Sequence, residues 1–88
     1  MKVAEALRAF RKSVKAGRVV FHPHAREMID FSGLDAVFVA RELEHAADGG
    51  FVTVNRNHLG RFVAHGRATI ISFEIQPEVV VVTVMILE

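Results

Sequence analysis

The spacing of apolar residues changes its period at Phe51, and this change limits the folds open to the chain. Before Phe51, apolar residues recur at the three- and four-residue spacing of an amphipathic helix. From Phe51 onward, the spacing changes to the period of two that is typical of strands. Helices followed by closely connected strands predict an α+β fold, with N-terminal helices packed on one face of a four- to five-stranded, mainly antiparallel sheet.

The first half is expected to contain three helices and one short strand. The first helix ends at Gly17, and the apolar residues that share one of its sides are Val3, Leu7, Phe10 and Val14. A strand then runs over residues 18–22, because Pro23 disfavours helical backbone at His22. The second helix covers residues 24–30 and is expected to bury Ala25, Met28 and Ile29.

Asp35 is expected to cap the third helix, which ends at Asp48-Gly49-Gly50. Its predicted buried side consists of Val37, Ala40, Leu43 and Ala47. Four strands follow, over residues 51–56, 61–65, 68–75 and 79–87. Their connections are short enough for antiparallel hairpins. No repeat or linker interrupts the chain, so we expect one domain over residues 1–88.

Alternation along these strands assigns side chains to two faces of the sheet. Residues expected to face the helices are Phe62, Ala64, Ile71, Phe73 and Ile75. Arg61 and His65 then point the other way with Ser72 and Glu74, and Arg67 joins them if its strand continues. The last strand is apolar on both faces, which favours an interior position or a dimer interface.

Composition and charge restrict where the protein works and what it binds. There is no cysteine, so disulfides and thiolate metal sites are excluded and a cytoplasmic location is expected. Charges scattered through the first residues argue against a secretory signal, and the longest apolar run is too short for a membrane helix. Residues 1–67 hold all 11 Lys and Arg with seven acids, a charge of +4, whereas residues 68–88 carry −3. This bias suits an RNA or phosphate partner, and it equally suits ordinary solvated helix faces.

Most enzyme chemistries lack the residues they need. His22 and His24 are two residues apart, but no third ligand with suitable spacing accompanies them, so no metal is expected. No serine lies in a nucleophile elbow and no glycine-rich phosphate loop is present, so no cofactor is expected. Metal-free RNA cleavage fits better, because it needs only a base, an acid and cations to stabilise the developing phosphorane. The residues that supply these groups are His22, His24, Arg26, Glu27, Arg61, His65, Arg67 and Glu74.

Each of these residues also has a structural explanation, which the sequence leaves open. His22 is placed to hydrogen-bond the backbone of the turn at Pro23, and His24 to pack half-buried against Phe21. The arginines and His65 are equally typical of an ordinary solvent-facing surface.

The segment HAREMIDFSGLDAV, preceded by VVF, resembles a family of small bacterial domains of unknown function. Members of that family read roughly F-x-x-H-A-x-E-R-M-x-x-R-G-I, and the later segments GRFVAHGRATIISFEI and VVVVTVMIL are similar to its strands. The resemblance covers nearly all of the chain after Arg18. Met28 and Ser32 stand at two positions that usually hold arginine. The family is itself similar to the barnase, EndoU, colicin and RelE superfamily of ribonucleases and toxins.

This resemblance implies a RelE-like fold and a toxin that cleaves RNA without a metal, with an antitoxin protein as partner. Together with the polar face expected on the sheet, it favours His24 and His65 for proton transfer, with Arg61 and Arg67 on the phosphate. The RNA-binding residues expected beside them are Arg26, His22 and Arg18. The alternative is a non-catalytic interaction module of the same fold, which binds a partner or forms a homodimer through its C-terminal strand. The valine-rich last strand and the two replaced arginines motivate that alternative.

Overall fold

Helices and strands separate along the chain as the change of period predicts. The computed structural model describes residues 2–87, and within them it contains three α-helices and one five-stranded sheet. The elements in chain order are α1 (Val3–Lys15), β1 (Val19–Phe21), α2 (Pro23–Phe31), α3 (Ala36–Gly49), β2 (Val52–Val54), β3 (Phe62–His65), β4 (Thr69–Ile75) and β5 (Val79–Ile86). The predicted α+β class is confirmed, and most strands are one to three residues shorter than predicted.

The sheet has the strand order β1-β5-β4-β3-β2. Strands β2 to β5 form an antiparallel meander, and β1 pairs in parallel with β5. One row across the sheet runs Phe21, Val81, Phe73, Phe62 and Val54. The pairing of β4 with β5 is irregular between Ser72 and Phe73. Strand β5 thus lies inside the sheet, which agrees with its apolar character on both faces.

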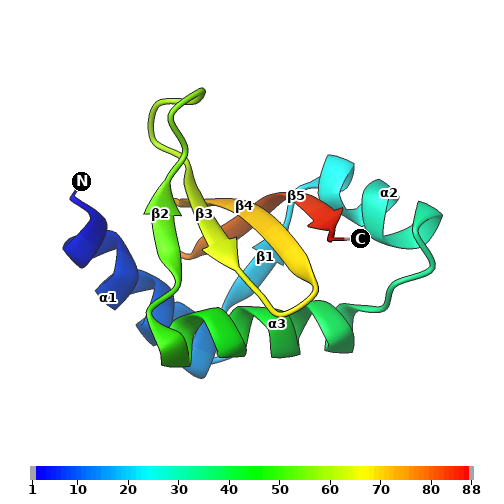
Figure 1. Ribbon diagram of the computed structural model, residues 1–88, viewed down its shortest axis with the longest axis horizontal. Coiled ribbons are helices and arrows are strands. Elements are labelled where there is room, and N and C mark those ends of the chain that lie inside the picture. The colour runs from blue at the N-terminus through cyan, green and yellow to red at the C-terminus, as the bar shows by residue number, and fades with distance from the viewer. Residues whose placement is uncertain (1, 88) are drawn as a thin grey trace.

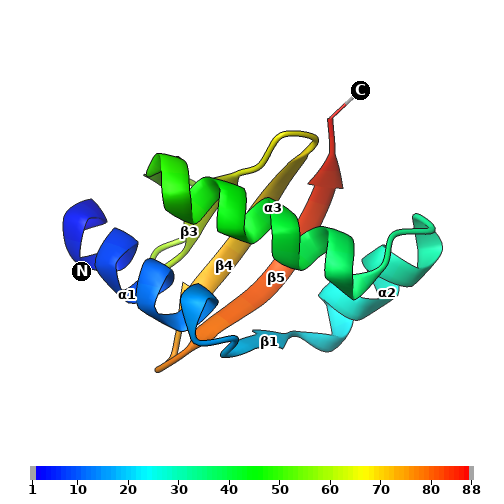
Figure 2. The ribbon, with the colours of Figure 1, turned by 90° about the horizontal axis from the view of Figure 1, so that it is seen from below.

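The three helices leave one face of the sheet open. Helices α1 and α3 pack against each other and against the same face of the sheet, whereas α2 contacts β5 and β1 (Figures 1 and 2). In the described part of the chain, no helix covers the opposite face (Figures 1 and 2). We call this the uncovered face, and its side chains include those of Arg61, Val63, His65, Ser72 and Glu74.

The core lies between the sheet and the helices α1 and α3. Phe73 is fully buried and stacks between two rings, with centroids 4.6 Å from Phe10 and 5.8 Å from Phe62. Ala64 and Ile71 are also fully buried, and Ile75 packs half-buried against the same cluster. The helix-facing side of β3 and β4 is therefore as predicted.

Local signals explain where two helices begin. The Asp35 carboxylate accepts a 2.7 Å hydrogen bond from the Phe38 N–H and caps α3. At α2, the His22 ring nitrogen Nδ1 accepts a 3.1 Å hydrogen bond from the His24 N–H, and Pro23 is the first helical residue. His22 therefore does have the structural role that Pro23 suggested.

The predicted buried side of α3 is partly wrong. Val37 is 61% exposed and Ala40 is also exposed, whereas the buried residues are Val39, Glu42, Leu43, Ala46 and Ala47. The prediction considered only apolar residues at helical spacing. Because the buried side includes the acid Glu42, the prediction placed the buried side of the helix around Val37 and Ala40 instead. Smaller corrections are that Val3 is exposed and that Met28 is only half-buried.

Candidate functional site

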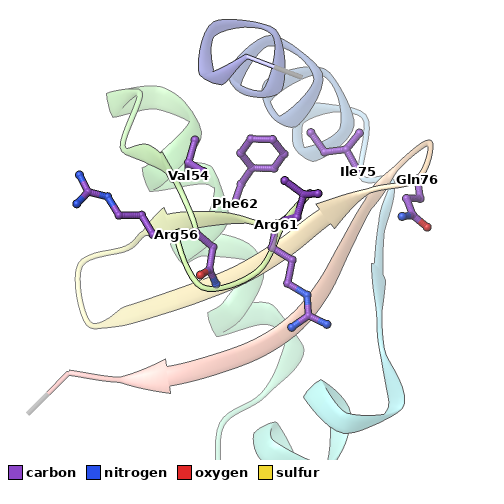
Figure 3. Close-up of a pocket in the computed structure, with 9 residues that line it drawn as sticks. Val54, Arg56, Arg61, Phe62, Ile75 and Gln76 are labelled. Carbon is purple, nitrogen blue, oxygen red and sulfur yellow. The ribbon is translucent and has the colours of Figure 1, made fainter.

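Arg61 and His65 stand at the two ends of β3 and belong to the uncovered face. Figure 3 shows Phe62 and Ile75 pointing toward α1, while Arg61 points to the other side of the sheet. One residue beyond the Phe62–Phe73 pair, Arg61 meets Glu74, and its Nε lies 3.5 Å from Glu74 Oε1. The Arg61 side chain is 30% exposed and the Glu74 side chain is 26% exposed, so this ion pair is partly shielded from solvent.

His65 is held by a side chain of the neighbouring strand. Its Nε2 lies 2.9 Å from the hydroxyl oxygen of Thr53 on β2. Which of the two atoms donates depends on the histidine tautomer. The contact fixes the ring of a half-buried histidine and leaves Nδ1 for another partner. Thr53 was not among the predicted site residues.

Arg61 and His65 do not converge on one point. They are four residues apart on one strand, which corresponds to roughly 13 Å at the strand rise of about 3.3 Å per residue. Glu74 on β4 holds the Arg61 guanidinium and Thr53 on β2 holds the His65 ring, so the two side chains are directed to different neighbouring strands. Any ligand that touches both must extend along β3.

His24 lies at the other side of the sheet. It is exposed in the first turn of α2, directly after the edge strand β1. Strands β5 and β4 lie between β1 and β3. The distance across the sheet from β1 to β3 is therefore three strand spacings of about 4.8 Å, or roughly 14 Å. The structure therefore does not bring His24 together with His65 or Arg61. His24 is also not half-buried against Phe21, as its structural explanation required.

The other predicted arginines are dispersed. Arg26 is exposed on α2 and lines a depression of about 490 Å³ beside Phe21 and Asp35. Arg18 is exposed after α1, and its carbonyl oxygen accepts a hydrogen bond from the Ser13 hydroxyl. Arg67 lies in the turn between β3 and β4, because β3 ends at His65. The condition under which Arg67 would share a face with Arg61 and His65, a strand that continues to Arg67, is thus not met.

A buried acid holds this turn. Glu42 of α3 is only 5% exposed, and its Oε1 accepts hydrogen bonds from the Ala68 N–H (2.6 Å) and the Thr69 hydroxyl (2.9 Å). Its Oε2 accepts a third, longer one from the Arg67 N–H (3.3 Å). A Cβ at Gly66 would lie 2.8 Å from Glu42 Oε1, so the turn requires glycine there.

These contacts determine the acidity of Glu42. Burial acts to raise the pKa of Glu42, but the hydrogen bonds from Ala68, Thr69 and Arg67 outweigh it and hold the pKa below its ordinary value. The carboxylate is therefore charged at neutral pH. Sequence reasoning missed this residue, although an acid between Val39, Leu43 and Ala46 on one helix side was a usable signal.

A groove of about 680 Å³ opens at one end of β3, between the loop that follows β2 and the end of β4 (Figure 3). The apolar side chains of Val54, Phe62 and Ile75 line the groove on the side toward α1, and Arg56 extends away from them (Figure 3). Leu59 in the same loop is completely exposed. His65 does not line this groove.

Within residues 2–87, no group of three His, Asp or Glu side chains is placed to hold a metal ion. None of the described helices is long and apolar enough to cross a membrane. Comparison with known proteins finds no matching family model, no similar curated protein and no similar solved structure.

Proposed function

We propose that this protein is a metal-independent ribonuclease of the RelE-like toxin type, which holds RNA along β3 on the uncovered face. The observation that carries the proposal is that Arg61 points away from the helices (Figure 3) and that His65, which alternates with the buried Phe62 and Ala64, belongs to the same face. A cation and a proton-transfer group along one strand suit a substrate that is both extended and regularly charged.

The reaction that fits these residues is attack by a ribose 2′-hydroxyl on its own phosphodiester. A base takes the hydroxyl proton, the bond from phosphorus to the 5′-oxygen breaks, and an acid protonates the leaving oxygen. Histidine can accept a proton near neutral pH, so His65 is the base that takes the 2′-hydroxyl proton, and solvent water protonates the leaving 5′-oxygen. Arg61 binds a neighbouring phosphate of the same RNA strand. Arg67 takes no part, because it lines a depression with Arg41 and His45 of α3.

Glu74 and Thr53 support these two groups. Glu74 orients the Arg61 guanidinium, and Thr53 orients the His65 ring. His24 takes no part in the same proton transfer, because β5 and β4 lie between it and His65. The toxin class and the antitoxin partner enter this proposal from the motif resemblance described above.

Ribonuclease assays in EDTA test this function, with short single-stranded RNA as substrate and the 2′,3′-cyclic phosphate end as product. His65→Ala is expected to lower the cleavage rate by at least about 100-fold, the usual contribution of a proton-transfer group. His58→Ala, an exposed loop histidine, is the matched control and should leave the rate unchanged. Induced expression should arrest bacterial growth, and His65→Ala should relieve the arrest. Full cleavage by His65→Ala would refute the assignment.

The uncovered face also favours a second candidate, a non-catalytic interaction module. Val20 on β1 is 49% exposed and Met85 on β5 is 60% exposed on this face, and Val80 on β5, which pairs with Val20, is half-buried. Strand β5 is paired with β4 along its length and with β1 only at Val79–Val81, so a homodimer through β5 would use its face or its edge beyond Val81. A partner protein such as an antitoxin would cover the same side chains.

Sedimentation separates the two candidates when wild type and Met85→Lys are compared. A concentration-dependent dimer that Met85→Lys dissociates, without any RNA cleavage, would favour the interaction module. A monomer that cleaves RNA and is insensitive to Met85→Lys would favour the ribonuclease.

A further inference from the structure

Helix α1 and the turn after it carry most of the positive charge of the chain. Residues 1–18 hold six of the 11 Lys and Arg but only one acid, Glu5, which gives a charge of +5. Residues 19–88 hold the other five bases and nine acids, which gives −4. The net charge of +1 therefore hides a strong separation of charge.

The positive side chains gather on the side of α1 that faces solvent. Its buried residues are Ala6, Phe10, Ser13 and Val14. Arg8, Lys12 and Lys15 are all exposed and follow the four- and three-residue spacing of one helix side, over a rise of roughly 10 Å. Arg18 is exposed just beyond the helix end.

Two of the cations are used to attach α1 to α3. The Arg11 Nε donates a 2.8 Å hydrogen bond to the Ala47 carbonyl oxygen, and the Lys15 ammonium pairs with Asp48. Arg8 and Lys12 form no ion pair with any residue between positions 2 and 87. These two therefore remain available to an external anion.

We infer that Arg8, Lys12 and Arg18 form a second RNA-binding surface, which contacts the phosphate backbone of a structured RNA. This inference rests on the proposed function. Helix α1 packs on the sheet face opposite to the one that bears Arg61 and His65 (Figures 1 and 2). The two surfaces lie on opposite sides of the sheet, so a few nucleotides along β3 do not contact α1, whereas a long folded RNA can contact both.

The chemistry of α1 favours a phosphate backbone over two other anionic partners. A helix that binds a membrane surface exposes an apolar side to the bilayer, but the apolar side of α1 is buried in the core of this protein. A protein partner needs apolar or aromatic side chains at the centre of the interface, and the exposed cation row offers only charge and aliphatic stems. A phosphate backbone is bound by positive charge alone, which this row of cations supplies.

The test compares Arg8→Glu/Lys12→Glu with Arg41→Glu/Arg56→Glu, which changes the charge equally at exposed positions on α3 and in the loop after β2. Binding of a long hairpin RNA and of a short single-stranded RNA is measured by fluorescence anisotropy at several salt concentrations. The α1 variant should bind the hairpin roughly tenfold or more weakly, and its salt slope should fall by about 0.9 for each lost duplex phosphate contact. Its binding and cleavage of the short RNA should stay at the wild-type level.

Equal losses in both double variants, or none in the α1 variant, would overturn the inference. Binding of the wild type to vesicles containing phosphatidylserine but not to the hairpin would also overturn it. Arg8→Gln/Lys12→Gln serves as a milder variant if the charge reversal unfolds the protein, which circular dichroism reports. His65→Ala should still bind the hairpin, so failure of the cleavage proposal and failure of this one give different results.

Discussion

The Glu42 carboxylate on α3 accepts a 2.6 Å hydrogen bond from the Ala68 N–H, and this contact fastens the helix layer to the turn between β3 and β4. Thr69 and Arg67 donate to the same carboxylate, and Gly66 leaves the space it occupies. A side chain of a helix thereby fixes the end of the strand on which His65 lies. Four predictions follow from this and related contacts.

Glu42→Ala should lower the free energy of unfolding by about 2–4 kcal/mol, because buried donors in the turn lose a charged acceptor. Urea denaturation followed by circular dichroism measures the change. Glu44→Ala, an exposed acid on the same helix, is the control and should change stability by less than about 0.5 kcal/mol. Equal effects of the two substitutions would show that the turn does not depend on Glu42.

Stability should decrease as pH falls below the ordinary glutamate pKa of 4.5, and Glu42 should account for part of the decrease. The pKa of Glu42 is lower in the folded protein, so the unfolded chain binds the proton more readily. The stabilisation is complete above pH 4.5 and is lost as pH falls through the folded pKa. Unfolding of wild type and Glu42→Gln between pH 3 and 7 measures this, and the variant should show the flatter profile.

Asp48 contributes in the same direction. The hydrogen bond and the charge of Lys15 lower the pKa of Asp48, although the pair is exposed to solvent. The pH comparison is therefore made in an Asp48→Asn background. An unchanged profile on Glu42→Gln in that background would contradict the assignment to Glu42.

Ser13→Ala should destabilise the protein by about 1–3 kcal/mol, although the substitution removes a single oxygen. The Ser13 hydroxyl donates to the Arg18 carbonyl and accepts a 3.1 Å hydrogen bond from the Val79 N–H, so it joins α1 to the starts of β1 and β5. Thermal unfolding measures the effect, with the exposed Ser32→Ala as control. A melting temperature equal to that of the control would refute the role of Ser13.

Phe73→Ala should cost about 3–5 kcal/mol, because it leaves a cavity between Phe10 and Phe62. Phe31→Ala removes the same ring from a side chain that is 94% exposed, and should cost less than about 0.5 kcal/mol. Chemical denaturation of both variants measures the difference. Similar values would mean that the core does not centre on Phe73.

The faces of β3 and β4 could be predicted because burial on one side leaves a period of two in the sequence. If the alternation were shifted by one residue, Phe73 would face solvent. The pattern therefore determines which residues of each strand are buried. The pattern on α3 failed because Glu42 occupies a buried position with a polar side chain, and hydrophobicity alone does not show which acids have hydrogen-bond donors around them.

The separation of His24 from His65 could not be predicted for a different reason. It depends on the strand order, in which β1 pairs with β5 and not with a strand near it in sequence. Periodicity assigns a residue to a face but does not say how many strands lie between two residues on the sheet. The prediction that both histidines act on one phosphate therefore needed information that local patterns do not contain.

The position of β5 inside the sheet has a consequence for biosynthesis. A ribosome makes residues 1–78 before Val79, the first residue of the strand that pairs with both β1 and β4. Until β5 emerges, Val19 to Phe21 have no strand partner, and the core that includes Val79 and Val81 is incomplete. The nascent chain thus exposes apolar helix surfaces until β5 has been made, and the sheet cannot be completed before that strand emerges.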